Sequence, residues 1–214
     1  MSEEEQKARD GLVRWGRSLF ERGLTPGSSG NLSVRLADGY LFTPTNSCLG
    51  FLDADRLSKL DADGKHVGGD PPTKELPLHF AFYESRPSAR AVVHLHSTHA
   101  TALSCLADTD PDNAIPPITP YVVMRVGRVP VVPYTRPGSA DVAPLIRAKA
   151  PGHPSILLGN HGPVVAGATL ESAVFAMEEL EETARLVLMT RGMAVRHLGS
   201  QEIADLEATF KLRG

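Results

Sequence analysis

The chain has 214 residues, of which 42% are hydrophobic and 22% charged, and this balance suits one compact domain with a sizeable core. A formal net charge of −3 argues against general attraction to nucleic acid or anionic membranes. No apolar stretch approaches the roughly 20 residues of a membrane helix, and the acidic N-terminal segment predicts no signal peptide. We therefore expect a soluble protein. Cys48 and Cys105 form no CxxC motif and cannot build a disulfide framework, so we expect it in the reducing cytoplasm.

The first part of the chain is predicted to contain a long amphipathic helix, a β-hairpin, two short elements and a second helix. In chain order these are a helix over 3–22, strands over 31–36 and 40–42, a short helix near 53–57, a strand before 63 and a helix over 73–86. Asp38-Gly39 is typical of the hairpin turn. Thr73 is a suitable N-cap for the second helix, and Pro77 falls in its first turn.

The rest of the chain continues this mixture of strands and helices. In chain order we expect a strand over 91–96, a helix capped by Ser97, strands over 121–126 and 129–132, a helix over 139–149, strands over 155–158 and 163–166, and helices over 169–191 and 201–211. No linker or repeat divides the sequence. We therefore predict a single α/β domain over 1–214, with a central, predominantly antiparallel or mixed β-sheet flanked by helices on both sides.

A metal site is predicted where the expected strand over 91–96 ends. His94 and His96 are two residues apart, so on a strand their side chains share one face. His161 lies in a glycine-flanked turn after an apolar strand, where a rigid scaffold can direct it into a cleft. Three histidines with one open position are typical of a catalytic zinc site. His99 follows closely, but we expect it on the next helix in a structural role.

The remaining histidines have no comparable sequence context. His66, His153 and His197 are expected to be exposed, and His79 is interpreted as a residue on the face of the helix over 73–86. The same helix begins near Glu75, where a carboxylate is stabilised by the positive end of the helix dipole. Beside three metal-binding histidines, Glu75 is predicted to face the metal, as a ligand in the resting enzyme and as an acid–base group with substrate present.

Three groups of hydroxyl, amide and cationic side chains are candidates for binding a phosphate. They are Ser28, Gly30 and Asn31 in a glycine-permitted loop, Thr45 and Asn46 after the hairpin, and Thr73 and Lys74 before the second helix. Tight loops and helix N-termini present N–H donors that suit phosphate oxygens. Each group by itself is a weak signal, and they indicate one site only if the fold brings them together.

Several ordered motifs resemble those of the class II aldolase and adducin family. They are SSGNLSVR at 28–35, TPT at 43–45, PPTKE at 71–75, AVVHLHSTH at 91–99 and NHGPVVAG at 160–167. The resemblance covers nearly the whole chain. It implies that His94, His96 and His161 bind one zinc ion per subunit and that Glu75 is the catalytic carboxylate.

The resemblance carries further expectations. It implies that the three donor groups bind the substrate phosphate and that Tyr121 transfers a proton, although Tyr121 fits a strand aromatic equally well. It also implies a homotetramer with active sites at the subunit interfaces. The expected activity is zinc-dependent cleavage of a carbon–carbon bond in a phosphorylated sugar or sugar acid through an enediolate.

Departures from the aldolase pattern indicate a particular branch of the family. Lys74 replaces a small hydroxyl residue, the loop TPTNSCLGFL lacks the aldolase glycine pattern, and the tail over 210–214 lacks a tyrosine. These features are similar to the branch that decarboxylates 3-oxo-tetronate 4-phosphates to dihydroxyacetone phosphate and CO2. A fuculose-phosphate type aldolase, a pentulose-phosphate 4-epimerase and a non-catalytic adducin-like module are the alternatives.

Overall fold

The computed structural model of the chain describes residues 1–210, which form one mixed sheet of eight strands with helices on both faces. The strands are β1 (Asn31–Leu36), β2 (Gly39–Phe42), β3 (Ser58–Asp61), β4 (His66–Gly68), β5 (Ala91–His94), β6 (Val131–Val132), β7 (Ser155–Leu158) and β8 (Gly162–Gly167). Their order across the sheet is β4-β3-β2-β1-β5-β8-β7-β6. Among the described strands only β6 and β7 pair in parallel, so the predicted mixed sheet is confirmed.

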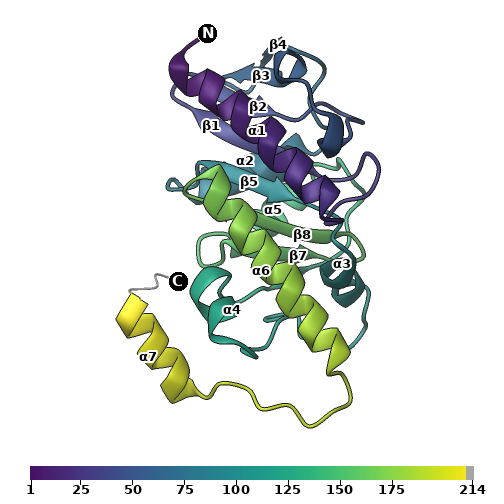
Figure 1. Cartoon of the computed structure of the whole chain (residues 1–214), viewed down its shortest axis with the longest axis vertical. Coiled ribbons are helices and arrows are strands. Elements are labelled where there is room, and N and C mark those ends of the chain that lie inside the picture. The colour runs from purple at the N-terminus through teal and green to yellow at the C-terminus, as the bar shows by residue number, and fades with distance from the viewer. Residues whose placement is uncertain (211–214) are drawn as a thin grey trace.

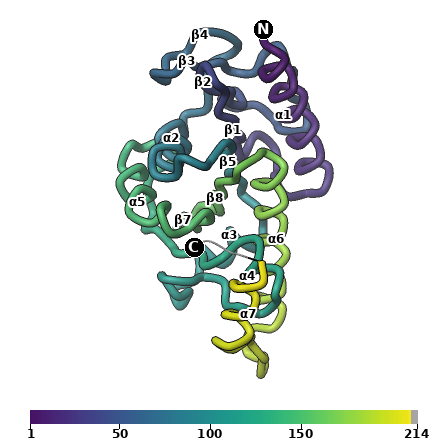
Figure 2. Tube along the Cα trace, turned by 90° about the vertical axis from the view of Figure 1, so that its left-hand side faces the viewer, coloured from purple at the N-terminus to yellow at the C-terminus, as the bar shows by residue number. Residues whose placement is uncertain are grey.

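The helices form two layers, one on each face of the sheet. They are α1 (Glu3–Glu21), α2 (Leu76–Ser85), α3 (Thr98–Ser104), α4 (Pro120–Arg125), α5 (Val142–Lys149), α6 (Leu170–Met189) and α7 (Ser200–Phe210), with 3-10 turns η1 (Leu49–Phe51) and η2 (Ala54–Arg56). Seen along the sheet, α1 and α6 lie on one side and α2 and α5 on the other (Figures 1 and 2). The described helices include none that is both long and apolar enough to cross a membrane.

Strand alternation divides the buried side chains between two cores. On β5, Val93 packs in the core under α1 and α6, whereas Val92 packs in the core under α2 and α5. His94 has the parity of Val92, so its side chain lies on the α2 side of the sheet. Strand β5 is central, between β1 and β8, and the site on it is therefore held by rigid neighbours.

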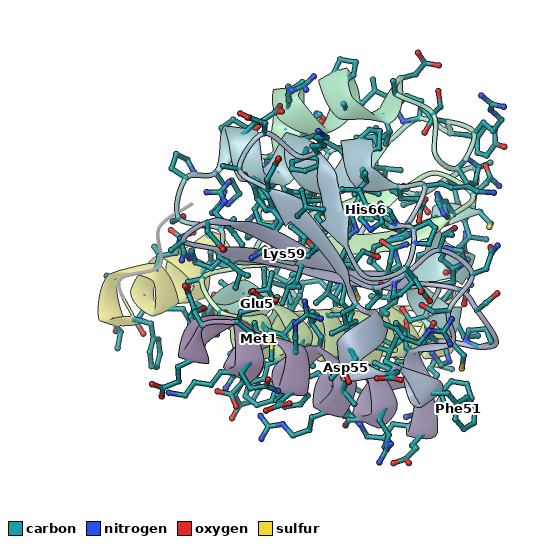
Figure 3. The ribbon with its side chains drawn as sticks, turned by 90° about the horizontal axis from the view of Figure 1, so that it is seen from above. Met1, Glu5, Phe51, Asp55, Lys59 and His66 are labelled. Atoms are coloured by element: carbon teal, nitrogen blue, oxygen red, sulfur yellow. The ribbon has the colours of Figure 1, made fainter. Side chains whose placement is uncertain are left out.

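Helix α1 is joined to the sheet by a partly buried ionic cluster. Glu5 pairs with Lys59 of β3 at 3.4 Å (Figure 3). Glu5 also pairs with Arg9 at 2.6 Å, and the Arg9 guanidinium donates to the carbonyl of Ala54 at 2.6 Å. The Ser2 hydroxyl caps the helix by accepting from the Glu5 amide. This helix has nearly the predicted range and covers one end of the sheet.

Two predicted elements are wrong. Residues predicted as a strand over 121–126 form helix α4, because Thr119 caps it by accepting from the Val122 amide and Pro120 fits the first helical position. Thr73 does not cap α2, whose N-cap is Glu75. A bridge between Pro44 and Pro72 keeps this segment extended, and the helix starts only after it. The last helix ends at Phe210, and the remainder of the predicted tail lies outside the described residues.

Candidate metal centre

Four side chains from three parts of the chain meet at the end of the central strand. Glu75 is the N-cap of α2, His94 ends β5, His96 follows two residues later, and His161 lies in the turn between β7 and β8. One nitrogen or oxygen from each lies within 4.8 Å of all the others. The structure thus brings together the four residues that the sequence analysis predicts as ligands, and they are called the ligand cluster below.

The ligand atoms of the cluster point at a common centre. The Nε2 atoms of His94 and His161 are 3.3 Å apart, and the Glu75 carboxylate lies 3.3 Å from the first and 3.5 Å from the second. His94 donates its Nδ1–H to the carbonyl of Pro163 at 2.9 Å, so its Nε2 carries a lone pair. The Nε2 atom of His96 is buried without a hydrogen-bond partner among the described residues. Converging lone pairs repel one another unless they share a cation, so the residues present fit a bound metal ion.

The protonation states of the cluster also suit a cation. Burial lowers the pKa of His94, His96 and His161, the last to about 4. Burial alone would raise the pKa of Glu75, but neighbouring His94 and the hydrogen bond donated by Asn31 outweigh it and lower that pKa. Near neutral pH the cluster therefore offers one carboxylate and three neutral imidazoles, the forms that bind a divalent metal.

The turn that carries His161 packs tightly against the segment that carries His96. Asn160 and Gly162 both have positive φ, at 53° and 153°. A Cβ on Gly162 would lie 2.5 Å from the carbonyl oxygen of Leu95. The hydroxyl of Thr101 also donates to the His161 carbonyl, at 3.4 Å. The close approach of these two backbone segments places His161 beside His94, which ends β5, and His96, which lies just beyond it.

Replacement of Gly162 by alanine should therefore destabilise the protein by about 1–3 kcal/mol, because both the backbone conformation and the space favour glycine. Urea denaturation of the variant measures this loss. Gly152→Ala is the matched control, since an added Cβ there has nothing within 4 Å. Equal stability of the two variants would contradict the argument.

The structure draws the predicted phosphate donors toward the cluster. The antiparallel Pro44–Pro72 bridge joins the segment that carries Thr45 and Asn46 to the segment that leads into Thr73 and Lys74, and the Thr45 amide donates to the Pro71 carbonyl at 2.9 Å. A Cβ on Gly30 would lie 3.0 Å from the His94 carbonyl, so the 28–30 loop abuts the end of β5. The side chain of Ser28 is exposed on that loop. These positions remain candidates for phosphate binding.

The side chain of Asn31 has other partners. Its amino group donates to Glu75 Oε2 at 2.7 Å and its carbonyl oxygen lies 2.5 Å from His79 Nε2. The Asn31 carboxamide is therefore engaged by Glu75 and His79, and one of its two N–H donors is left for a phosphate.

Tyr121 is not brought to the cluster within one chain. Its side chain is 55% exposed on α4, and it does not line the small cavity beside Glu75 and His161. His99 has the predicted structural role, because its ring and its amide both contact the Glu181 carboxylate of α6, at 2.8 and 2.9 Å.

The expectation for the remaining histidines is partly wrong. His66 and His197 are exposed as predicted, whereas His153 is half-buried because it lines a groove.

Two residues beside the site have roles that the sequence analysis does not predict. Arg136 lines the cavity next to Glu75, from the loop whose Gly138 packs against Lys74. His79, expected on a helix face, is fully buried and bonded to Asn31. Its position four residues after Glu75 is a signal that could have found it, since residues four apart share a helix face.

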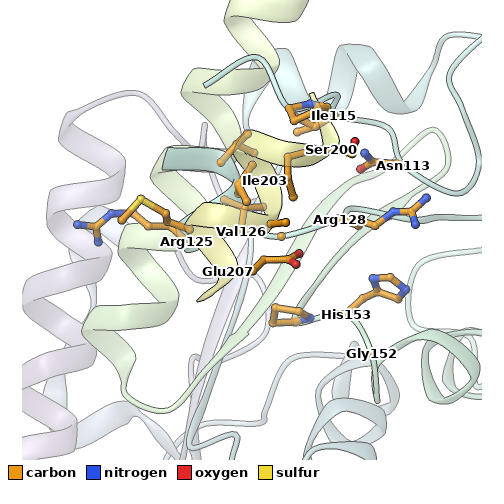
Figure 4. A pocket seen from close by; sticks show the side chains of 17 residues that line it. Asn113, Ile115, Arg125, Val126, Arg128, Gly152, His153, Ser200, Ile203 and Glu207 are labelled. Carbon is orange, nitrogen blue, oxygen red and sulfur yellow. The ribbon is translucent and has the colours of Figure 1, made fainter. Parts of the chain in front are cut away.

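A larger groove lies elsewhere on the molecule. It has a volume of about 930 Å3 and lies between α4, α7 and two loops, one that carries Arg128 and one that carries His153. Ile203 and Glu207 of α7 line it (Figure 4). None of the cluster residues contributes to it. Chemistry belongs to the smaller cavity at the ligand cluster, where the titratable groups converge.

The mixed sheet with this cluster at the end of its central strand defines a lyase of the aldolase type. Residues 10–188 match the family model for the class II aldolase and adducin N-terminal domain. The chain belongs to the class II aldolase and adducin family, as the sequence motifs indicated.

Individual relatives refine the comparison. A 3-oxo-tetronate 4-phosphate decarboxylase of Pectobacterium atrosepticum is 52% identical over 203 residues, which cover 94% of this chain and 93% of that protein. The L-fuculose phosphate aldolase of Escherichia coli K12 is 35% identical, over 90% of this chain and 88% of its own. The crystal structure of YgbL from Klebsiella pneumoniae superimposes with a TM-score of 0.92 at 49% identity, covering 96% of this chain and 100% of that one.

Proposed function

We propose that this enzyme decarboxylates a 3-oxo-tetronate 4-phosphate to dihydroxyacetone phosphate and CO2. The observation that carries the proposal is a complete ligand cluster in a chain 52% identical to a protein named for that reaction. The identity to a fuculose phosphate aldolase is lower, at 35%, and this difference favours the decarboxylase over the aldolase. Retention of all four cluster residues argues against a non-catalytic adducin-like module.

We propose zinc as the metal of the cluster. Tetrahedral bonds of about 2.0–2.1 Å place ligand atoms roughly 3.3–3.4 Å apart. The separation of 3.3 Å between the Nε2 atoms of His94 and His161 is near this value, and all four ligand atoms lie within 4.8 Å of one another, which supports this choice. His94, His96 and His161 would hold the ion, and Glu75 would complete the set in the resting enzyme. Zinc, when bound, supplies a Lewis acid that stabilises negative charge on a substrate oxygen.

The other residues bind the substrate and move a proton. The Thr45–Asn46 and Thr73–Lys74 donors and the 28–30 loop bind the phosphate on C4. Departure of CO2 breaks the C1–C2 bond, and the electron pair passes into an enediolate over C2 and C3. Glu75, after taking up a proton from solvent, or a water molecule that it orients, then delivers a proton to C2 and so forms dihydroxyacetone phosphate. Lys74 is exposed, and its positive charge favours a substrate that carries both a carboxylate and a phosphate group.

A direct assay tests the proposal. We expect the purified protein to contain one zinc ion per chain and to release equal amounts of dihydroxyacetone phosphate and CO2 from a 3-oxo-tetronate 4-phosphate. Fuculose 1-phosphate and rhamnulose 1-phosphate are the comparison substrates, because their cleavage yields an aldehyde instead of CO2. Turnover of only these two would make the enzyme an aldolase, and an active protein without stoichiometric metal would contradict the proposed centre.

We propose further that the enzyme is a cytoplasmic homotetramer with active sites at subunit interfaces. The exposure of Tyr121 in the single chain supports this, since a proton-transferring tyrosine would then act from a neighbouring subunit. Sedimentation velocity tests the assembly, and a monomeric active enzyme would contradict it.

A further inference from the structure

A buried row of side chains runs from the catalytic carboxylate into the core beneath α2. The Tyr83 hydroxyl lies 2.7 Å from Ser33 Oγ, which lies 2.7 Å from His79 Nδ1. His79 Nε2 lies 2.5 Å from Asn31 Oδ1, and Asn31 Nδ2 lies 2.7 Å from Glu75 Oε2. Ser33 and His79 have no exposed surface, and Asn31 and Tyr83 are 6% and 3% exposed. Of the five residues in this row, the proposed proton transfer uses only Glu75.

Two regular elements build the row. Asn31 and Ser33 are two residues apart on β1, so both side chains face α2. Glu75, His79 and Tyr83 are four residues apart at the start of α2 and along it, so they share the helix face that packs on β1. Side chains from α2 and from β1 therefore alternate along the row.

When Glu75 is ionised, the donors and acceptors of these groups allow the hydrogen bonds of the row to run in a single direction. A carboxylate only accepts, so Asn31 presents its amino group to Glu75 and its carbonyl oxygen to His79. His79 must then donate from Nε2 and accept at Nδ1 from the Ser33 hydroxyl. The Ser33 oxygen in turn accepts from the Tyr83 hydroxyl. Every donor in the row therefore points toward the catalytic carboxylate.

Burial keeps the row in this state. It lowers the pKa of His79 to about 3, so the imidazole is neutral and carries a single N–H. Burial also raises the pKa of Tyr83, which keeps its proton. The Arg35 guanidinium lies 4.7 Å over the Tyr83 ring, and it donates to the Tyr83 backbone carbonyl at 2.5 Å. The far end of the row is therefore anchored.

We propose that His79, with Ser33 and Tyr83 behind it, is a positioning residue that fixes the carboxamide of Asn31 and through it the catalytic carboxylate. Without the His79 donor, the Asn31 carboxamide is free to rotate and can turn its oxygen toward Glu75, which repels the carboxylate. With it, Glu75 Oε2 is held by Asn31 while Oε1 faces His161 at 3.5 Å. This inference rests on the proposed role of Glu75.

The test compares His79→Leu, which removes the donor, with His79→Gln, which can restore an N–H toward Asn31. For the zinc-loaded enzyme we expect His79→Leu to lower kcat by about 10- to 100-fold with KM within a factor of two. Chelator competition should show zinc affinity falling over the same range, and this second readout needs no substrate. His79→Gln should recover most of both losses. Circular dichroism checks that each variant is folded.

A double-mutant cycle separates positioning from simple packing. If His79 acts through Asn31, His79→Leu should add almost nothing to the kcat and zinc-affinity losses of Asn31→Ala. Tyr83→Phe removes only the terminal hydroxyl and should lower kcat by a few-fold. The control is Tyr40→Phe, a neighbouring ring 5.2 Å from Tyr83 on β2, which should change nothing.

The outcomes distinguish this inference from the proposed function. Wild-type protein that fails to decarboxylate would overturn the proposed function alone, because the zinc-affinity cycle would still test the row. Folded His79→Leu protein with wild-type zinc affinity would overturn the positioning role. Losses for His79→Leu and Asn31→Ala that multiply in the double variant would do the same.

Discussion

Replacement of His96 by alanine should abolish turnover and weaken metal binding by at least about 100-fold while leaving the fold in place. The four-ligand set gives each ligand about a quarter of a binding free energy of roughly 10–16 kcal/mol, hence about 2.5–4 kcal/mol. His96 lies just beyond β5, and its Nε2 makes no hydrogen bond with the described protein. Its removal therefore costs the fold little. Metal content after dialysis and the rate of CO2 release measure the two effects.

His66→Ala is the control for this experiment. His66 lies on the exposed edge strand β4, where its ring lies within hydrogen-bond distance of the neighbouring Gly68 carbonyl, at 2.8 Å. That variant should keep full metal content and activity. A His96→Ala enzyme that retained stoichiometric metal and normal turnover would show that the ligand set is wrong.

Replacement of Glu75 by glutamine should lower kcat by about 10²–10⁴-fold with the metal still bound. Glutamine has nearly the same shape and can accept the hydrogen bond from Asn31, but it cannot carry a proton to C2. Its amide is also a weaker metal ligand than a carboxylate, yet the three imidazoles remain. We therefore expect loss of turnover with metal content near one per chain, measured by steady-state kinetics and elemental analysis.

Glu84→Gln is the matched control on the same helix. Glu84 is 52% exposed and pairs with Arg147 at 2.6 Å on the surface, so its replacement should leave kcat within a factor of two. A Glu75→Gln enzyme that differed no more than this from wild type would exclude Glu75 as the acid–base group.

Much of the fold follows from short-range patterns that the sequence shows directly. The hairpin over 31–42 depends on alternation and on a two-residue turn, and its predicted strands agree with the structure almost to the residue. Helix α6 lies within the helix predicted over 169–191, and the structure adds a capping box at Thr169 and Ser172. The strand predicted over 121–126 is wrong because β-branched composition there counts for less than Thr119 and Pro120, which start a helix.

The sequence predicts the part of the candidate site that depends on residue type and on spacing along the chain. Two histidines with a spacing of two on an extended chain share one face, and both belong to the ligand cluster, although β5 ends at His94 and His96 lies just beyond the predicted strand's observed end. His79 has only a weaker signal, its spacing of four residues from Glu75, because an isolated histidine within a helix has many structural roles. Only its partners on β1, about 48 residues away, give it meaning.

The sequence by itself therefore determined the elements, the alternation of faces and the kinds of ligand, because these depend on interactions within a few residues. Tertiary structure alone decided that β5 lies between β1 and β8, and with it that His161 meets His94 and that Asn31 meets Glu75. These encounters join segments separated by about 67 and 44 residues, respectively. These long-range contacts depend on how the whole sheet packs between its two layers of helices. No local sequence pattern contains that information.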